Sequence, residues 1–241
     1  MQNVFVSGGT GYMGKALVRD LVARGHSARA LARPGSEGKV AAGAEAVSGN
    51  ALEAESFTER IPPADTFVHL VGTSHPAPWK EREFRAVDLA SLGASAGAAA
   101  SAGVSHFFYV SVAHLALVMK AYIRVRTECE EILASQPFPC TILRAWYVLG
   151  PGHWWPVSLK PIYSLLEAIP TTREGARRLG LVSLSQMVPA LVWATENPPT
   201  RTRVLEVRKF GRHSPSERLL ERPVSKTHCS GDNGRDAYLS R

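Results

Sequence analysis

The chain has 241 residues, of which 45% are apolar and 20% are charged, which is typical of one soluble α/β domain and too short for two domains with linkers. Its net charge of +7 does not indicate nucleic-acid binding, because more than half of it lies in one segment at the end of the sequence. Residues 208–241 contain eight Lys and Arg and four Asp and Glu, which gives this segment a net charge of +4. No apolar run is long enough to span a bilayer, and Cys129, Cys140 and Cys229 have no spacing typical of a disulfide framework or a metal site. Because residues 1–3 lead directly into an apolar run without a basic and apolar leader, we expect a cytoplasmic protein.

Short β-branched or aromatic runs alternate along the chain with longer Ala- and Leu-rich stretches. Strands are predicted at residues 3–7, 27–32, 44–48, 66–71, 106–111, 140–149 and 203–207. Helices are predicted at residues 12–24, 79–102, 120–135, 161–168 and 185–196. Parallel strands need such crossovers, and right-handed crossovers place helices on both faces of the sheet. The sequence therefore predicts a doubly wound parallel sheet of the Rossmann-like α/β class.

This single domain is expected to cover residues 1–207, with a small C-terminal substrate cap formed by segments near 151–180. The composition changes after Val207, where apolar residues become scattered and Ser, Gly and Asp clusters indicate turns. We expect residues 208–241 to form a disordered or irregular tail.

A glycine-rich turn follows the first predicted strand and opens the first predicted helix. Its candidate ligand-binding residues are Gly8, Thr10, Gly11, Tyr12, Met13 and Gly14. Glycines permit a tight turn and a close approach of backbone N–H groups to a pyrophosphate, which the positive end of the helix also attracts. The strand before the turn and the helix after it favour a dinucleotide site over the alternative, a structural turn without a ligand.

Further candidates follow the later strands, at the edge of the sheet where ligands bind in this architecture. They are Arg33, Asn50, Ala51, Gly72 and Thr73. Arg33 stands where an acidic residue would bind the free ribose of NAD, and its planar guanidinium suits a 2′-phosphate. The sequence thus favours NADP(H), with NAD(H) as second choice, unless Arg33 is only a solvated residue at a strand end.

Several motifs together resemble a known family over residues 1–207. They are Gly8, Gly11 and Gly14, Leu31-Ala32-Arg33, Tyr109-Val110-Ser111, Tyr122-x-x-x-Arg126-x-x-x-Glu130, and Leu143-Arg144 with Val148-Leu149-Gly150. The chain resembles the atypical short-chain dehydrogenases/reductases, of the NmrA-like and complex I accessory-subunit-like kind. The resemblance implies that Ser111 polarises the reacting oxygen and that Tyr122 is the acid/base, with Arg126 where the family has lysine. Arginine is not equivalent to lysine, so the alternative is that Tyr122 and Arg126 only cover a helix face.

Aromatic and histidine residues gather after the fourth and sixth predicted strands, where a substrate would approach. These candidates are His75, Trp79, Trp146, His153 and Trp154. They indicate an apolar pocket with polar tips for an aromatic or isoprenoid-like ligand, or else ordinary packing of a lid. No metal site is expected, because no carboxylate or cysteine accompanies the histidines at ligand spacing.

These observations predict an NADP(H)-binding oxidoreductase, or an epimerase- or dehydratase-like enzyme, acting on a carbonyl, an alcohol or a related small organic substrate. The alternative is a non-catalytic NAD(P)-binding redox sensor or assembly factor that has a protein partner.

Overall fold

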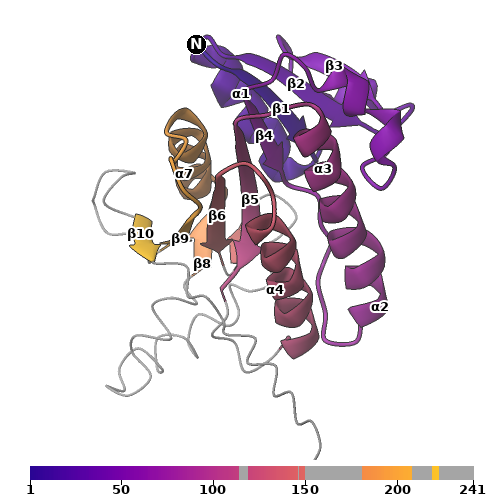
Figure 1. Cartoon of the computed structure of the whole chain (residues 1–241), viewed down its shortest axis with the longest axis vertical. Helices are drawn as coiled ribbons and strands as arrows, with labels where there is room; N and C mark the ends of the chain where they lie inside the picture. Colours follow the sequence, from indigo (N-terminus) through magenta and orange to yellow (C-terminus); the bar gives the residue numbers. More distant parts are fainter. Residues whose placement is uncertain (114–118, 146, 150–180, 208–218, 223–241) are drawn as a thin grey trace, which may run out of the picture.

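The computed structural model describes residues 1–113, 119–145, 147–149, 181–207 and 219–222. An eight-stranded sheet in the order β10-β9-β6-β5-β4-β1-β2-β3 forms its centre (Figure 1). The strands are β1 Asn3–Ser7, β2 Ser27–Ala32, β3 Glu45–Ser48, β4 Thr66–His69, β5 His106–Val112, β6 Cys140–Ala145, β9 Arg203–Val207 and β10 Leu219–Arg222. The first seven are parallel and β10 is antiparallel to β9, which confirms the predicted Rossmann-like class.

Helices cover both faces of this sheet, as a doubly wound fold requires (Figure 1). They are α1 Tyr12–Ala23, α2 Glu81–Glu83, α3 Ala90–Ser101, α4 Lys120–Ala134 and α7 Leu184–Glu196, with single turns η1 Glu37–Lys39, η2 Ala54–Ser56 and η3 Thr58–Arg60. Successive residues of β1 face opposite sides, because strand side chains alternate. Val4 and Val6 pack in the core under α1 and α7, whereas Phe5 packs in the core under α3 and α4.

The structure differs from several of the predicted elements. The predicted helix 79–102 contains a wide π-helical turn, η4 Phe84–Leu89, between α2 and α3. The predicted strand 140–149 is two strands, because β7 Tyr147–Leu149 leaves the main sheet and pairs in parallel with β8 Leu181–Ser183. The expectation of an irregular tail is wrong at residues 219–222, which form β10.

The predicted strand 66–71 ends at His69, so residues 70 and 71 already belong to the loop above the sheet. The predicted cap segments near 151–180 and the predicted helix 161–168 lie outside the described residues. Within the described ranges, no helix combines the length and apolar character needed to cross a membrane.

Two histidines are buried in the sheet, and both must stay neutral there. Burial lowers the pKa of His69 to about 3 and that of His106 to about 4. His69 Nδ1 shares hydrogen bonds with the Ser7 and Ser95 hydroxyls, at 2.9 and 3.1 Å. These short contacts satisfy a neutral imidazole, so protonation of either ring opposes folding.

Acid should therefore destabilise the protein from about pH 6.5 downward. In this range the two histidines bind protons in the unfolded chain but stay neutral in the native state. Each unit of pH below that point costs up to about 1.4 kcal/mol per buried histidine, until the native pKa near 3 or 4 is reached. Urea unfolding between pH 7 and pH 5 measures this loss. In His106→Gln, the free energy of unfolding should fall less steeply with decreasing pH. His75→Gln is the matched control, because His75 is exposed. An unchanged slope in His106→Gln would contradict the assignment.

Candidate functional site

The glycine turn between β1 and α1 is built from glycines with different tasks. Gly8 has a φ of +79°, and a Cβ on it would lie 2.8 Å from the Leu70 carbonyl carbon. A Cβ on Gly14 would lie 2.2 Å from the Gly8 carbonyl oxygen. Gly11 has a φ of −71° and would bring its Cβ only to 3.2 Å from the same oxygen. The fold therefore requires Gly8 and Gly14, whereas Gly11 keeps the turn open toward a ligand.

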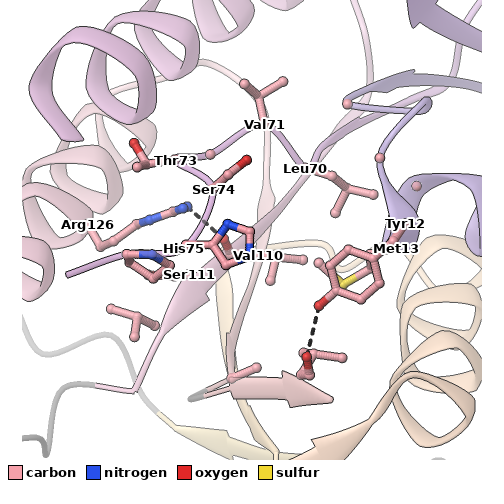
Figure 2. A pocket seen from close by; sticks show the side chains of 18 of the residues that line it. Tyr12, Met13, Leu70, Val71, Thr73, Ser74, His75, Val110, Ser111 and Arg126 are labelled. Carbon is pink, nitrogen blue, oxygen red and sulfur yellow. Dashed lines mark hydrogen bonds between the residues drawn. The ribbon is translucent and has the colours of Figure 1, made fainter. Parts of the chain in front are cut away.

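Two chambers meet over this turn, outside the carboxyl ends of the strands. The larger, of about 780 Å³, extends toward β2 and β3, and the smaller, of about 410 Å³, extends toward β5 and α4. Figure 2 shows the smaller chamber from close by. Both chambers are lined by Gly8, Gly11 and the loop of residues 70–74. Their junction above a helix N-terminus suits a ligand with two bulky ends and an anionic middle.

The larger chamber brings together the predicted residues Thr10, Arg33, Asn50 and Ala51. The Asn50 side chain is fixed, because its Nδ2 donates to Glu53 Oε1 at 2.8 Å and its Oδ1 accepts from the Leu52 N–H at 3.2 Å. Arg33 is exposed at the end of β2, and its guanidinium has no partner among the described residues. It is therefore available to an anionic group in this chamber.

The smaller chamber brings together the predicted Tyr12, Met13, Ser111, Tyr122 and Arg126. The predicted Gly72 and Thr73 line both chambers at their junction.

Ser111 and Tyr122 face this chamber from β5 and α4. The Ser111 hydroxyl donates a hydrogen bond of 2.6 Å to Glu130, whose carboxylate also pairs with Arg144 at 2.5 Å. The Tyr122 ring packs on Phe84, with ring centroids 4.8 Å apart. Burial raises the pKa of the Tyr122 phenol, and the Arg126 charge only partly opposes this. The phenol therefore keeps its proton at neutral pH.

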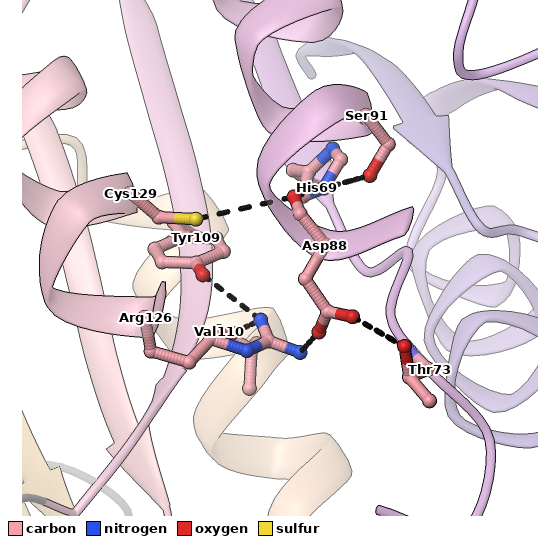
Figure 3. A network of polar contacts seen from close by, with 8 residues as sticks. All are labelled: His69, Thr73, Asp88, Ser91, Tyr109, Val110, Arg126 and Cys129. Carbon is pink, nitrogen blue, oxygen red and sulfur yellow. Dashed lines mark hydrogen bonds and ion pairs between the residues drawn. The ribbon is translucent and has the colours of Figure 1, made fainter. Parts of the chain in front are cut away.

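Both terminal nitrogens of the Arg126 guanidinium are held by hydrogen bonds within the protein (Figure 3). Its Nη2 donates to Asp88 Oδ1 at 2.5 Å, and its Nη1 donates to the Tyr109 hydroxyl at 2.9 Å and the Val110 carbonyl at 3.1 Å. Its guanidinium carbon lies 5.0 Å from the centre of the Tyr122 ring, and only 8% of its side chain is exposed. A fork with these three partners differs from a lysine ammonium that points into the cleft.

The sequence did not single out Asp88 or the roles of Glu130 and Arg144. Asp88 lies in an otherwise apolar helical stretch, Ala86-Val87-Asp88-Leu89-Ala90. A buried acid in such a stretch requires a partner, and this was the available signal.

The predicted substrate residues have separate outcomes. His75 lines the smaller chamber, with an unusual φ of +52°. Trp79 is 82% exposed and is not among the residues that line either chamber. Trp146, His153 and Trp154 lie outside the described residues.

A glycine turn at a helix N-terminus between two chambers of a doubly wound sheet defines a dinucleotide-binding α/β protein. Residues 8–149, more than half of the chain, match the family model described as NAD(P)H-binding, and the chain belongs to this family. This family agrees with the dinucleotide binding that the resemblance implies.

Solved structures share this fold at low sequence identity. One is the Bordetella bronchiseptica enzyme WbmH in complex with NAD+, which is 15% identical with a TM-score of 0.64, over 86% of this chain and 75% of that one. A short-chain dehydrogenase/reductase superfamily protein from Agrobacterium tumefaciens with bound NAD is 18% identical with a TM-score of 0.62, over 85% and 77%. UDP-N-acetylglucosamine 4-epimerase from Bacillus cereus is 15% identical with a TM-score of 0.65, over 90% and 82%.

Among curated proteins, a sterol-4-alpha-carboxylate 3-dehydrogenase, decarboxylating, from Dictyostelium discoideum is 34% identical over 71 residues. The match covers 29% of this chain and 22% of that protein, so the chain spans about a fifth of the length of this relative.

Proposed function

We propose that this protein is a cytoplasmic NADP(H)-dependent oxidoreductase that acts on a carbonyl or alcohol group. The proposal rests on the pair of chambers: one holds Arg33, which has no partner among the described residues, and the other holds the protonated phenol of Tyr122. The similarity to a dehydrogenase and to NAD-bound enzymes supports the same chemistry.

The residues of the cleft fit a dinucleotide along its whole length. The adenosine would lie in the larger chamber beside Asn50 and Ala51, with its 2′-phosphate on Arg33. The pyrophosphate would lie over Gly11 at the N-terminus of α1. The nicotinamide would lie in the smaller chamber, where it supplies or accepts a hydride when bound.

Tyr122 supplies the proton in this scheme. Its phenol lines the smaller chamber and burial keeps it protonated, so it donates to the oxygen of a carbonyl that is being reduced. The Ser111 proton is directed to Glu130, so its oxygen accepts a hydrogen bond from the alcohol that forms. The protonated phenol is the form that the reduction of a carbonyl requires.

The walls of the smaller chamber favour an uncharged substrate. Val110, Val112, Ala145 and Val148 line it, and the charge of Arg126 is balanced by Asp88. An aromatic or isoprenoid-like ketone or aldehyde satisfies these walls, whereas a carboxylate there would have no counter-ion among the described lining residues.

Turnover is tested with NADPH and a panel of apolar ketones and aldehydes, followed by the loss of cofactor absorbance. Tyr122→Phe should lower the rate of reduction by roughly 100-fold or more while leaving the Kd for NADPH unchanged. Tight NADPH binding without turnover of any substrate would instead favour the non-catalytic sensor or assembly factor.

The cofactor preference is tested at Arg33. Arg33→Asp should weaken NADP+ binding by about 2 kcal/mol, roughly 30-fold, because charge-assisted bonds to the 2′-phosphate are lost and a repulsive charge is gained. NAD+ binding should change little. Isothermal titration calorimetry with both cofactors measures the difference.

Lys39→Asp is the matched control, since it makes the same change of charge on η1, outside both chambers. It should leave both affinities near those of the wild type. If Arg33→Asp weakened NADP+ and NAD+ binding equally, the 2′-phosphate role of Arg33 would be excluded.

A further inference from the structure

Asp88 is a buried acid that contacts the cleft only through other residues. It is 1% exposed, and the π-helical turn η4 places it between α2 and α3. The two carboxylate oxygens of Asp88 accept hydrogen bonds from different residues, as Figure 3 shows. Oδ2 accepts from the Thr73 N–H at 3.0 Å and the Thr73 hydroxyl at 2.6 Å, while Oδ1 accepts from Arg126 at 2.5 Å.

Both partners of Asp88 line the cleft, although Asp88 itself does not. Thr73 lines the two chambers at their junction, and Arg126 lines the smaller chamber beneath Tyr122. The acid therefore links the loop at the junction of the two chambers to the helix that carries the proton donor.

The loop rests directly on this ion pair. A Cβ on Gly72 would lie 2.5 Å from Arg126 Nη2 and 3.1 Å from Asp88 Oδ1. Because no side chain separates the Gly72 backbone from the pair, a change in the pair must move the loop.

We propose that Asp88 is a positioning residue that sets the loop at residues 72–73 and the Tyr122-bearing helix α4 in one fixed relation. One carboxylate oxygen holds Thr73 at the junction of the chambers, and the other holds Arg126 under the Tyr122 ring. This role rests on the proposed function, since it assigns a buried residue outside the cleft to both cofactor binding and proton donation.

The charges around Tyr122 make the positioning role of Asp88 measurable through the pKa of the phenol. The titratable groups near the phenol are Arg126 and Cys129 on α4 and Asp88 on η4, while His75 lines the same chamber. The Arg126 charge lowers the pKa of Tyr122, whereas the Asp88 charge raises it. Asp88→Asn should therefore lower the pKa of the phenol, which a purely structural residue would not do.

The experiment compares full-length Asp88→Asn with the wild type in two measurements. The Kd for NADPH, measured by calorimetry, should rise roughly tenfold because the loop loses its fixed position. The pH profile of carbonyl reduction should lose its alkaline limb earlier, by about one pH unit or more. Ser91→Ala is the matched control, because Ser91 is equally buried but bonds to the backbone carbonyl of Asp88, at 3.4 Å.

The outcomes separate the two proposals. If the wild type does not bind NADPH, the proposed function fails; if it binds and Asp88→Asn equals it in both measurements, the positioning role fails. Should turnover be absent, the ¹³Cζ signal of Tyr122, assigned by its loss in Tyr122→Phe, reports the same shift of ionisation. An equal effect of Ser91→Ala would also overturn the role.

Thr73→Val keeps the buried charges paired and serves if Asp88→Asn does not fold. Loss of the hydroxyl bond to Asp88 should raise the Kd for NADPH about fivefold, whereas Thr73→Ser, which keeps the bond, should stay near the wild type. An unchanged Kd in Thr73→Val would overturn the positioning role.

Discussion

Gly11→Val should weaken the binding of both NADP(H) and NAD(H) by at least about 100-fold, or roughly 3 kcal/mol, while the protein stays folded. Gly11 has a φ that any residue adopts, and the closest atom to its Cβ would be the Gly8 carbonyl oxygen at 3.2 Å. The valine would instead fill the space over the N-terminus of α1 in both chambers. Calorimetry measures the affinity, and circular dichroism measures the fold.

Two other glycines provide the controls for this prediction. Gly93→Val, on α3, has open space around its Cβ and should leave both binding and stability intact, because valine is a better helix former than glycine. Gly14→Val should lose the fold itself, because its Cβ would lie 2.2 Å from the Gly8 oxygen. Retained cofactor binding in Gly11→Val would contradict the glycine turn as the cofactor site.

Arg126→Met should lower the free energy of unfolding by about 3–5 kcal/mol. The change leaves the Asp88 carboxylate buried without its counter-ion, and it removes the donor to the Tyr109 hydroxyl and the Val110 carbonyl. The uncompensated charge costs more than the packing of methionine restores. Urea unfolding at pH 7, followed by fluorescence, measures the loss.

Arg124→Met is the matched control, two residues away on the same helix. Arg124 pairs with Glu81 at the surface, where 54% of the arginine side chain is exposed. Its loss should change stability by less than about 0.5 kcal/mol, since exposed ion pairs contribute little. Similar losses in the two variants would show that Arg126 is not a buried structural cation.

The parts of the fold that local patterns determine were predictable. The apolar run of β1, the glycine turn and the helix α1 follow one another in the sequence and in space, and backbone sterics fix their geometry. The position of Arg33 in the cleft was predictable for the same reason, because the pairing of β2 with β1 places the end of β2 beside the glycine turn.

The remaining features depend on tertiary contacts that periodicity does not encode. Strand propensity runs through residues 140–149, but the departure of β7 from the main sheet depends on its pairing with β8, some thirty residues later. β10 follows a polar segment and is defined by pairing with β9 rather than by a pattern of its own.

The site shows the same limit at two residues. The resemblance to a known family singled out Tyr122 and Arg126, whereas Asp88 joins Arg126 from a different helix, 38 positions earlier in the chain. The resemblance therefore pointed to Tyr122 and Arg126 but could not show that Arg126 is already paired with a buried acid.

The hydrogen bonds of Arg126 to three different residues limit how this site can evolve. A lysine has one nitrogen and cannot reach Asp88, Tyr109 and Val110 in the directions that the guanidinium does. A single exchange of Arg126 for lysine would thus break some of these hydrogen bonds, and neighbouring positions would have to change with it to replace them. A change from the tyrosine–arginine pair to a tyrosine–lysine pair therefore requires several substitutions that depend on one another.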